Sequence, residues 1–129
     1  MKVSVKLTLL LTTVLLFTCS PKKEQVLQIN GTVLNTNTKS ILLMKPNQDL
    51  RFDSIIEISV ANGKFHYESK LQNPEAVRLY LGEFKENRSG RFMPLFLENE
   101  TIFLTIYSEE EFDKNIINGG KLNEEYKES

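Results

Sequence analysis

The chain has 129 residues, of which 40% are hydrophobic and 26% charged, with one Cys, one His, no Trp and a formal net charge of -1. A single Cys excludes an intramolecular disulfide framework and a Cys-rich zinc module, and a single His excludes the common His-based metal clusters. The near-neutral charge excludes the basic footprint of nucleic-acid-binding proteins, so we expect no DNA or RNA partner, no metal and no cofactor.

Residues 1–18 have the order of segments that is typical of a secretory signal peptide. Lys2 and Lys6 supply positive charge, and an uncharged, mostly apolar stretch follows at residues 8–17. This stretch is too short to cross a bilayer core, which needs about 20 residues. We therefore expect a cleaved leader rather than a transmembrane helix. Its removal takes away two lysines and no acid, which changes the formal charge to -3.

The leader ends at Leu16-Phe17-Thr18-Cys19, which resembles the lipobox of bacterial lipoproteins, although Thr18 departs from the small residue usual before the Cys. The resemblance implies that Cys19 becomes the acylated first residue, with residues 19–24 as a tether to the membrane. It also implies a place in the cell envelope, at the periplasmic face of the outer membrane. Surface export stays open because Glu24 is the only acid in the tether. The competing interpretation is an unmodified Cys beside an ordinary cleavage site.

From residue 25 onward, apolar and polar residues alternate in short runs, with turn signals every eight to twelve residues. This pattern predicts strands and little helix. Seven or eight antiparallel strands, some apolar on both faces, are best buried as two packed sheets. We therefore predict an all-β fold, a small antiparallel β-sandwich over residues 25–122. The expected strands lie at residues 25–34, 40–45, 55–60, 64–69, 76–81, 91–98, 101–107 and 115–117.

The strongest turn signal is Asn62-Gly63, because both residues tolerate positive φ in a tight hairpin. We expect the hairpin to join two paired strands, with Phe65 facing the same core as Ile58. Gly31 inside the first strand indicates a bulge or a close backbone approach.

Two later strands carry further signals. Pro94 lacks an amide donor and predicts an edge position or a bulge. Phe103 and Tyr107 lie on the second face of the strand at residues 101–107, which predicts partial cover of that face too.

Two helical segments are expected near the end of the chain. Residues 108–114 form the first, where Ser108 with Glu111 fits a capping box. Asn123 is expected to cap the second, over residues 123–129, with Glu124 and Glu125 suited to the helix dipole.

Five motifs in order carry a family resemblance. They are Ile29-Asn30-Gly31-Thr32-Val33, Asp53-Ser54-Ile55, Asn62-Gly63-Lys64-Phe65, Phe96-Leu97-Glu98-Asn99 and Gly119-Gly120-Lys121-Leu122-Asn123. This order resembles the domain of unknown function 4369, an N-terminal β-rich module of Bacteroidota lipoproteins. In longer members a helical connection and a thioredoxin-like domain of the thiol-disulfide oxidoreductase or peroxiredoxin type follow. The resemblance implies that residues 123–129 begin this connection, and no Cys after Cys19 can carry the redox chemistry.

Few residues suggest chemistry. Asp53-Ser54-Ile55 is similar to the O-glycosylation sequon of secreted Bacteroidota proteins, so Ser54 is a candidate modification site; the alternative is a turn in which Asp53 caps its own backbone. Ser54, His66 and an Asp would make a hydrolytic triad, but no nucleophile elbow surrounds Ser54. We expect His66 to face solvent, because it alternates with Phe65. The acids at residues 109–111 are consecutive, which predicts a solvated helix face rather than a calcium site.

Together these patterns predict a non-enzymatic, lipid-anchored lipoprotein of the cell envelope that acts as a binding or positioning module. Its partners would be the membrane, through Cys19, and a protein of the envelope. The alternative is the detached or truncated N-terminal part of a thiol-disulfide oxidoreductase that lacks its catalytic domain.

Overall fold

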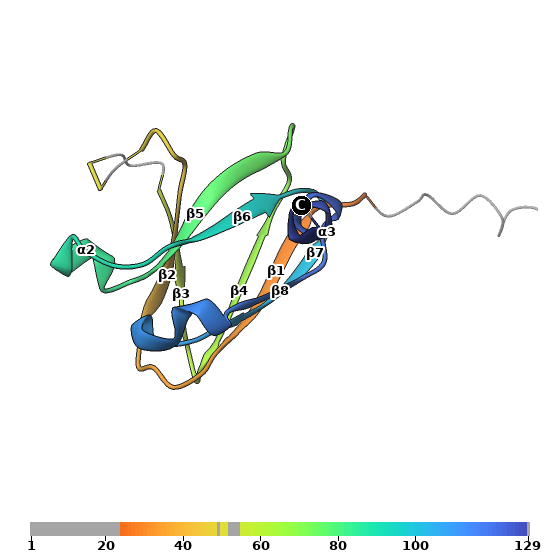
Figure 1. Ribbon diagram of the computed structural model, residues 1–129. Helices are drawn as coiled ribbons and strands as arrows, with labels where there is room; N and C mark the ends of the chain where they lie inside the picture. The colour runs from red at the N-terminus through yellow and green to blue at the C-terminus, as the bar shows by residue number, and fades with distance from the viewer. Residues whose placement is uncertain (1–23, 49, 52–54, 129) are drawn as a thin grey trace, which may run out of the picture.

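The computed structural model describes residues 24–48, 50–51 and 55–128. Eight strands and three short helical segments lie within these residues (Figure 1). The strands are β1 (Leu27–Val33), β2 (Ser40–Met44), β3 (Ile56–Ser59), β4 (Lys64–Ser69), β5 (Glu75–Leu81), β6 (Met93–Leu97), β7 (Thr101–Ile106) and β8 (Ile116–Asn118). The helical segments are α2 (Phe84–Asn87), the 3-10 helix η1 (Glu109–Lys114) and α3 (Lys121–Glu128).

The strands form two four-stranded sheets, which confirms the predicted β-sandwich. The first sheet has the order β4-β1-β7-β8 and the second the order β3-β2-β5-β6. All strand pairs in these sheets are antiparallel except β1 with β7, which run parallel with Ile29 opposite Ile102. Strand alternation specifies which residues face the core, but it cannot specify this direction, because β7 enters the first sheet only after the chain has crossed the second. Pro94 lies in β6 at a sheet edge, as predicted.

The core fills the space between the two sheets with alternate residues of each strand. Leu27, Ile29 and Ile102 from the first sheet and Leu79 from the second are all fully buried. Gly31 lies in the same inward series, and the ring of Phe65 from β4 occupies the space where a side chain would stand. A Cβ at Gly31 would lie 1.9 Å from Phe65 Cζ, so a side-chain ring approaches this glycine. The predicted bulge or close backbone approach is wrong, because the β1–β4 register continues through Gly31 without interruption.

The Asn62-Gly63 turn has the predicted backbone but a different role. Asn62 has φ 53° and Gly63 φ 72°, as a tight turn with two left-handed residues requires. The flanking strands, however, lie in different sheets, and their only bridge joins Ala61 to Lys64. The predicted hairpin is therefore wrong as a strand pair, because the turn carries the chain from one sheet to the other. Phe65 still shares the core with Ile58.

The two outer faces differ. On the second sheet, Leu42, Met44 and Tyr80 are buried beneath Leu50, Ile55 and Phe84. On the first sheet, Phe103 is 55% exposed. The predicted partial cover of this face is present at Tyr107, which is half-buried, and absent at Phe103, because α2 and the residues before β3 lie against the second sheet.

The helical segments depart from prediction in their detail. η1 is a 3-10 helix, and Ser108 makes no side-chain cap to it, so the predicted capping box is wrong. Glu111 instead accepts hydrogen bonds from Asn35 on one carboxylate oxygen and from Lys114 on the other. α2 forms between the strands expected at residues 76–81 and 91–98, where no helix was predicted.

Candidate functional site

The predicted site residues are only partly within the described part of the chain. Cys19, Asp53 and Ser54 lie outside the described residues. Acylation of Cys19 and glycosylation of Ser54 therefore stay predictions, and the structure does not test a triad of Ser54 with His66. His66 is exposed, as predicted, on the outer face of the first sheet. Its Nδ1 lies 2.8 Å from Oδ1 of Asn30 on the neighbouring strand β1. This contact orients the His66 ring.

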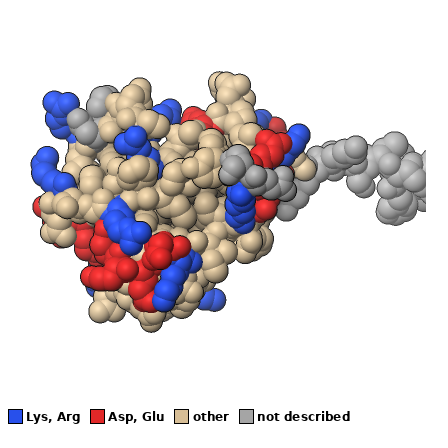
Figure 2. All heavy atoms as spheres, in the orientation of Figure 1, with Lys and Arg blue, Asp and Glu red and all other residues tan. Residues whose placement is uncertain are grey.

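The acids at residues 109–111 do not converge. Glu109 accepts a hydrogen bond from the backbone N–H of Arg91, whereas Glu111 accepts one from Asn35 Nδ2 at 3.1 Å and one from Lys114 Nζ at 2.6 Å. The Lys114 hydrogen bond lowers the pKa of Glu111, with a smaller contribution from Asn35. Figure 2 shows acidic side chains gathered at the lower left, where η1 lies. Within the described residues no group of three or more His, Cys, Asp or Glu is placed to hold a metal ion.

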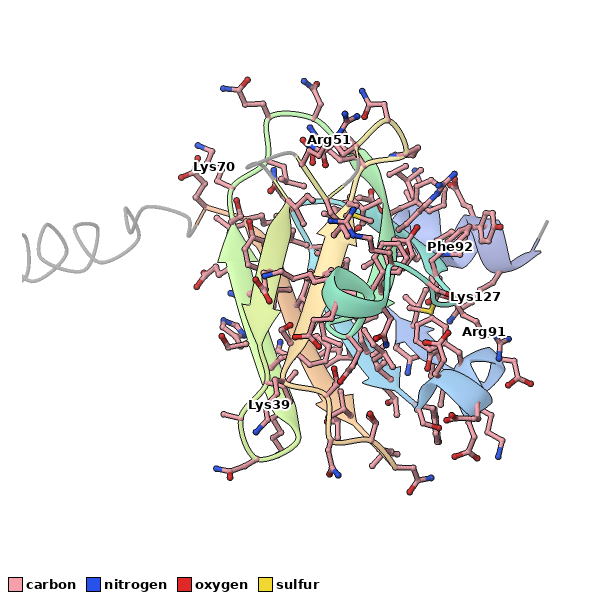
Figure 3. The ribbon with its side chains drawn as sticks, turned by 90° about the vertical axis from the view of Figure 1, so that its left-hand side faces the viewer. Lys39, Arg51, Lys70, Arg91, Phe92 and Lys127 are labelled. Carbon is pink, nitrogen blue, oxygen red and sulfur yellow. The ribbon has the colours of Figure 1, made fainter. Side chains whose placement is uncertain are left out.

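The most distinctive surface is an aromatic platform on the outer face of the second sheet, formed by Arg78, Tyr80, Phe84 and Phe92. The rings of Tyr80 and Phe84 stack with centroids 4.1 Å apart, and Phe92 lies 5.7 Å from Tyr80. The guanidinium carbon of Arg78 is 4.7 Å from the centre of the Phe92 ring. Phe92, labelled in Figure 3, remains 44% exposed, and Arg78 is half-buried.

The platform follows from alternation along β5 and from the position of α2. Val77, Leu79 and Leu81 face the core, which directs Arg78 and Tyr80 to the outer face. This site was not predicted from the sequence, because α2, which carries Phe84, was not expected between β5 and β6. The signal in the sequence was that Arg78 and Tyr80 are two residues apart in a strand, which places both side chains on the same face.

A pocket adjoins the platform on the side of β2. Met44, Tyr80 and Phe84 contribute apolar lining, and Arg51 and Arg88 also line it. An exposed ring under a cation, with further arginines beside an apolar pocket, suits a ligand group that is flat or apolar and carries negative charge.

A polar network at the surface joins the second sheet to α2, with Glu57 and Lys85 about half exposed and Ser40 buried. Glu57 accepts hydrogen bonds from Lys85 Nζ and from Ser40 Oγ, each at 2.9 Å. These two bonds, the one from Lys85 first, lower the pKa of Glu57. The network fixes the helix that carries Phe84.

α3 is hydrogen-bonded to the edge of the second sheet through Asn123 and the backbone of Phe96, a contact that we call the Asn123 latch. Asn123 is buried, its Oδ1 accepts from the Phe96 backbone N–H at 2.9 Å, and its Nδ2 donates to the Phe96 carbonyl at 2.9 Å. The predicted cap at Asn123 is therefore wrong, because α3 begins two residues earlier, at Lys121. The first amides of α3 are bound by acids of the β6–β7 turn: Glu98 accepts from Leu122 N–H at 2.7 Å.

The glycines before α3 permit this latch. Gly119 and Gly120 have φ of 101° and 85°, and a Cβ on Gly119 would lie 2.4 Å from the Thr101 carbonyl oxygen. The motifs at residues 96–99 and 119–123 are thus joined by hydrogen bonds in the folded chain.

These features define a two-sheet β-sandwich module with an aromatic and cationic surface and a C-terminal latch. The chain belongs to the family described as Domain of unknown function (DUF4369), whose model matches residues 27–126. No curated protein and no solved structure matches the chain. In the described part of the chain, no helix has the length and apolar character needed to span a membrane.

Proposed function

We propose that this protein is a non-catalytic binding or positioning module, held in the cell envelope by lipid on Cys19. The observation that carries the binding role is the aromatic platform, where Phe92 is 44% exposed beneath Arg78. An exposed aromatic ring and a guanidinium together favour an anionic or aromatic group on a partner. Arg78 and Tyr80 lie in β5, which is hydrogen-bonded to β2 and β6 on its two sides.

The lipid anchor is supported by the position of Cys19, the only Cys of the chain, directly after the apolar stretch and before a polar tether. Two or three acyl chains would hold the protein on the periplasmic face of the outer membrane without any protein segment in the bilayer.

Metabolic labelling with an alkyne-tagged fatty acid tests the anchor. We expect label on the wild-type chain and on Ser20→Ala, which leaves the acceptor thiol intact, and none on Cys19→Ala. Cys19→Ala should also move from the membrane fraction to the soluble fraction. Equal labelling of wild type and Cys19→Ala would contradict the anchor.

A matched pair of aromatic variants tests the platform. Phe92 and Phe103 are both exposed but lie on opposite sheets, so Phe103→Ala controls for the loss of an exposed ring. We expect envelope proteins that photo-cross-link to the wild type to be lost in Phe92→Ala and in Arg78→Gln, and kept in Phe103→Ala. Equal recovery with all three variants would contradict binding at the platform.

The alternative function, a detached front part of an oxidoreductase, makes a different prediction for α3. If that segment normally docks on a following domain, its amides should exchange rapidly in this chain while the strands stay protected. The Asn123 latch favours protection, because it ties α3 to β6 within the same module.

A further inference from the structure

The outer face of the first sheet is uncharged at its centre and carries an exposed aromatic ring. Its two central strands are β1 and β7, which lie side by side (Figure 1). The outward residues of these strands alternate with buried core positions, and all of them are uncharged: Gln28, Asn30, Thr32, Thr101, Phe103 and Thr105. The ring of Phe103 is 55% exposed, so an apolar surface lies open in the middle of polar side chains.

Strand register places a polar side chain on each side of Phe103. Asn30 of β1 is its partner in the parallel pair, and Asn118 of β8 is its partner in the antiparallel pair. His66 of β4 follows as the partner of Asn30. Neighbouring strands lie about 4.8 Å apart, so one row across the sheet holds an imidazole, an amide, a phenyl ring and a second amide.

Hydrogen-bonding groups in this row are available to a ligand. His66 Nδ1 lies 2.8 Å from Oδ1 of Asn30. An amide oxygen can only accept, so Nδ1 donates, and Nε2 of the neutral ring is left as an acceptor. Within the described residues, Nδ2 of Asn30 and the side-chain amide of Asn118 form no hydrogen bond. The row therefore offers both donors and acceptors beside an open ring.

The charges nearest this row stand at its rim and are opposite in sign. Lys64 and Glu68 lie two residues to each side of His66 on β4, and both are exposed. An open depression of about 700 Å³ lies on this face, with Asn30, Lys64, His66 and Phe103 among its lining residues. Among the described residues, the face carries no cluster of Lys and Arg, which a polyanion requires. The surface is therefore complementary to an uncharged ligand.

A sugar ring has the chemistry that this surface lacks in its own contacts. The face of an aromatic ring is negative, so it attracts the C–H groups on the flat side of a pyranose whose hydroxyls are equatorial. Each hydroxyl both donates and accepts, which suits the amide donors and the imidazole acceptor beside the ring. A nucleobase would also stack, but its phosphates need cations. An apolar peptide would cover the amides without giving them partners.

We propose that the outer face of the first sheet binds a neutral glycan with equatorial hydroxyls. One pyranose ring stacks on Phe103, and its hydroxyls form hydrogen bonds with Asn30, His66 and Asn118. This site is separate from the aromatic platform, which lies on the second sheet and favours negative charge. The two outer faces of the sandwich then bind ligands of different chemistry.

Titration with sugars, followed by amide NMR, tests the site. The full chain is isotope-labelled and purified in a zwitterionic detergent that carries no sugar. It is titrated with cellohexaose and with chitohexaose, two neutral glycans whose ring substituents are all equatorial. We expect at least one of them to shift amides of β1, β7 and β8 and to leave those of β5 and β6 in place. Absence of these shifts with both glycans would overturn the proposal.

Variants of Phe103 separate stacking from a loss of apolar area. We expect Phe103→Ala and Phe103→Leu each to weaken glycan binding about tenfold, because neither keeps an aromatic face. Phe103→Trp should bind at least as tightly as wild type. Phe92→Ala removes an exposed ring from the other sheet and should leave the affinity unchanged. Equal affinities of Phe103→Leu and wild type would overturn stacking on this ring.

The polar groups and the rival ligands need their own measurements. We expect Asn118→Ala to weaken glycan binding about threefold, because one hydrogen-bonding side chain is lost. Tighter binding of hexauridylate or of an oligogalacturonate than of the neutral glycans would overturn the assignment of an uncharged ligand. Self-association that Phe103→Ala abolishes, without glycan binding, would assign the face to a second copy instead. Each of these results leaves the cross-linking test of Phe92 and Arg78 unaffected, so the two sites are judged separately.

Discussion

At the scale of single residues, Gly31 is fixed by its neighbour rather than by its backbone angle. Its position under the Phe65 ring leaves no room for even a methyl group, since a Cβ would lie 1.9 Å from Phe65 Cζ. We expect Gly31→Ala to lower the free energy of unfolding by about 2 kcal/mol, because the overpacked ring must move. Urea denaturation measures this change. Gly90→Ala, whose Cβ would meet no atom closer than 3.4 Å, is the control and should stay within about 0.5 kcal/mol.

Glu57 gives a pH-dependent contribution at the same scale. Its hydrogen bonds from Lys85 and Ser40 lower its pKa in the folded state below the usual 4.5. The folded chain therefore binds the proton less readily than the unfolded chain, so the contribution is complete well above pH 4.5 and is lost as pH falls through the folded value. Because both partners are about half exposed, the contribution should be below about 1 kcal/mol.

Chemical denaturation between pH 7 and pH 3 tests this contribution. We expect Glu57→Gln to lose less stability than wild type as pH falls across that range, and Lys85→Met to behave similarly. Glu110→Gln removes a carboxylate elsewhere on the surface and should keep the wild-type slope. Identical slopes for Glu57→Gln and wild type would contradict the role of the Lys85 hydrogen bond.

At the scale of elements, α3 depends on one side chain. Asn123 supplies both a donor and an acceptor to the Phe96 backbone, in the way that a neighbouring strand would. We expect Asn123→Ala to leave two backbone groups of β6 without these partners and to lower the free energy of unfolding by about 1 to 3 kcal/mol. Amide exchange should become fast across α3 and at Phe96.

Two further variants sharpen this test. Asn123→Asp keeps the acceptor but loses the donor, so its effect should be intermediate. Asn87→Ala, in the exposed helix α2, should leave α3 protected. Unchanged exchange in Asn123→Ala would show that α3 is held by other contacts.

Strand existence was predictable at this scale, and strand partnership was not. All eight expected strands are present, with bounds that differ by at most two residues. Alternation and turn residues specify them because both are local signals. The Asn62-Gly63 turn shows the limit: its left-handed backbone was correctly predicted, yet its flanking strands belong to different sheets. The turn determines where the chain reverses. Core packing, in which Ile58 and Phe65 take part from different sheets, determines which strands become neighbours.

At the scale of the whole molecule, both sheets contribute to one core, so they should unfold together. Leu79 of the second sheet and Ile102 of the first are fully buried in the same cluster. We expect Leu79→Ala and Ile102→Ala each to cost about 2 to 5 kcal/mol and to shift circular dichroism and tyrosine fluorescence transitions equally. Leu34→Ala, at a 40% exposed position, is the control and should change stability little. Separate transitions for the two probes would indicate sheets that unfold independently.

The candidate site also combines features that the local sequence predicts with features that depend on tertiary contacts. Alternation along β5 directs Arg78 and Tyr80 to one face. Phe84 and Phe92 join them because the segment that contains α2 folds over the outer face of the second sheet. The latch is similar: Phe96-Leu97-Glu98-Asn99 and Gly119-Gly120-Lys121-Leu122-Asn123 were visible as motifs, and their contact through Asn123 was not.

The amino-acid sequence by itself determined the all-β class, the strand positions, the inward series of residues and the turn at Asn62-Gly63, because each depends on alternation or on backbone preferences within a few residues. Only the tertiary structure decided the parallel β1–β7 pair, the exposed Phe103, the aromatic platform and the role of Asn123. Each of these joins segments that are distant in the chain or depends on which segments cover a face. Their energies come from contacts that exist only once the two sheets have packed.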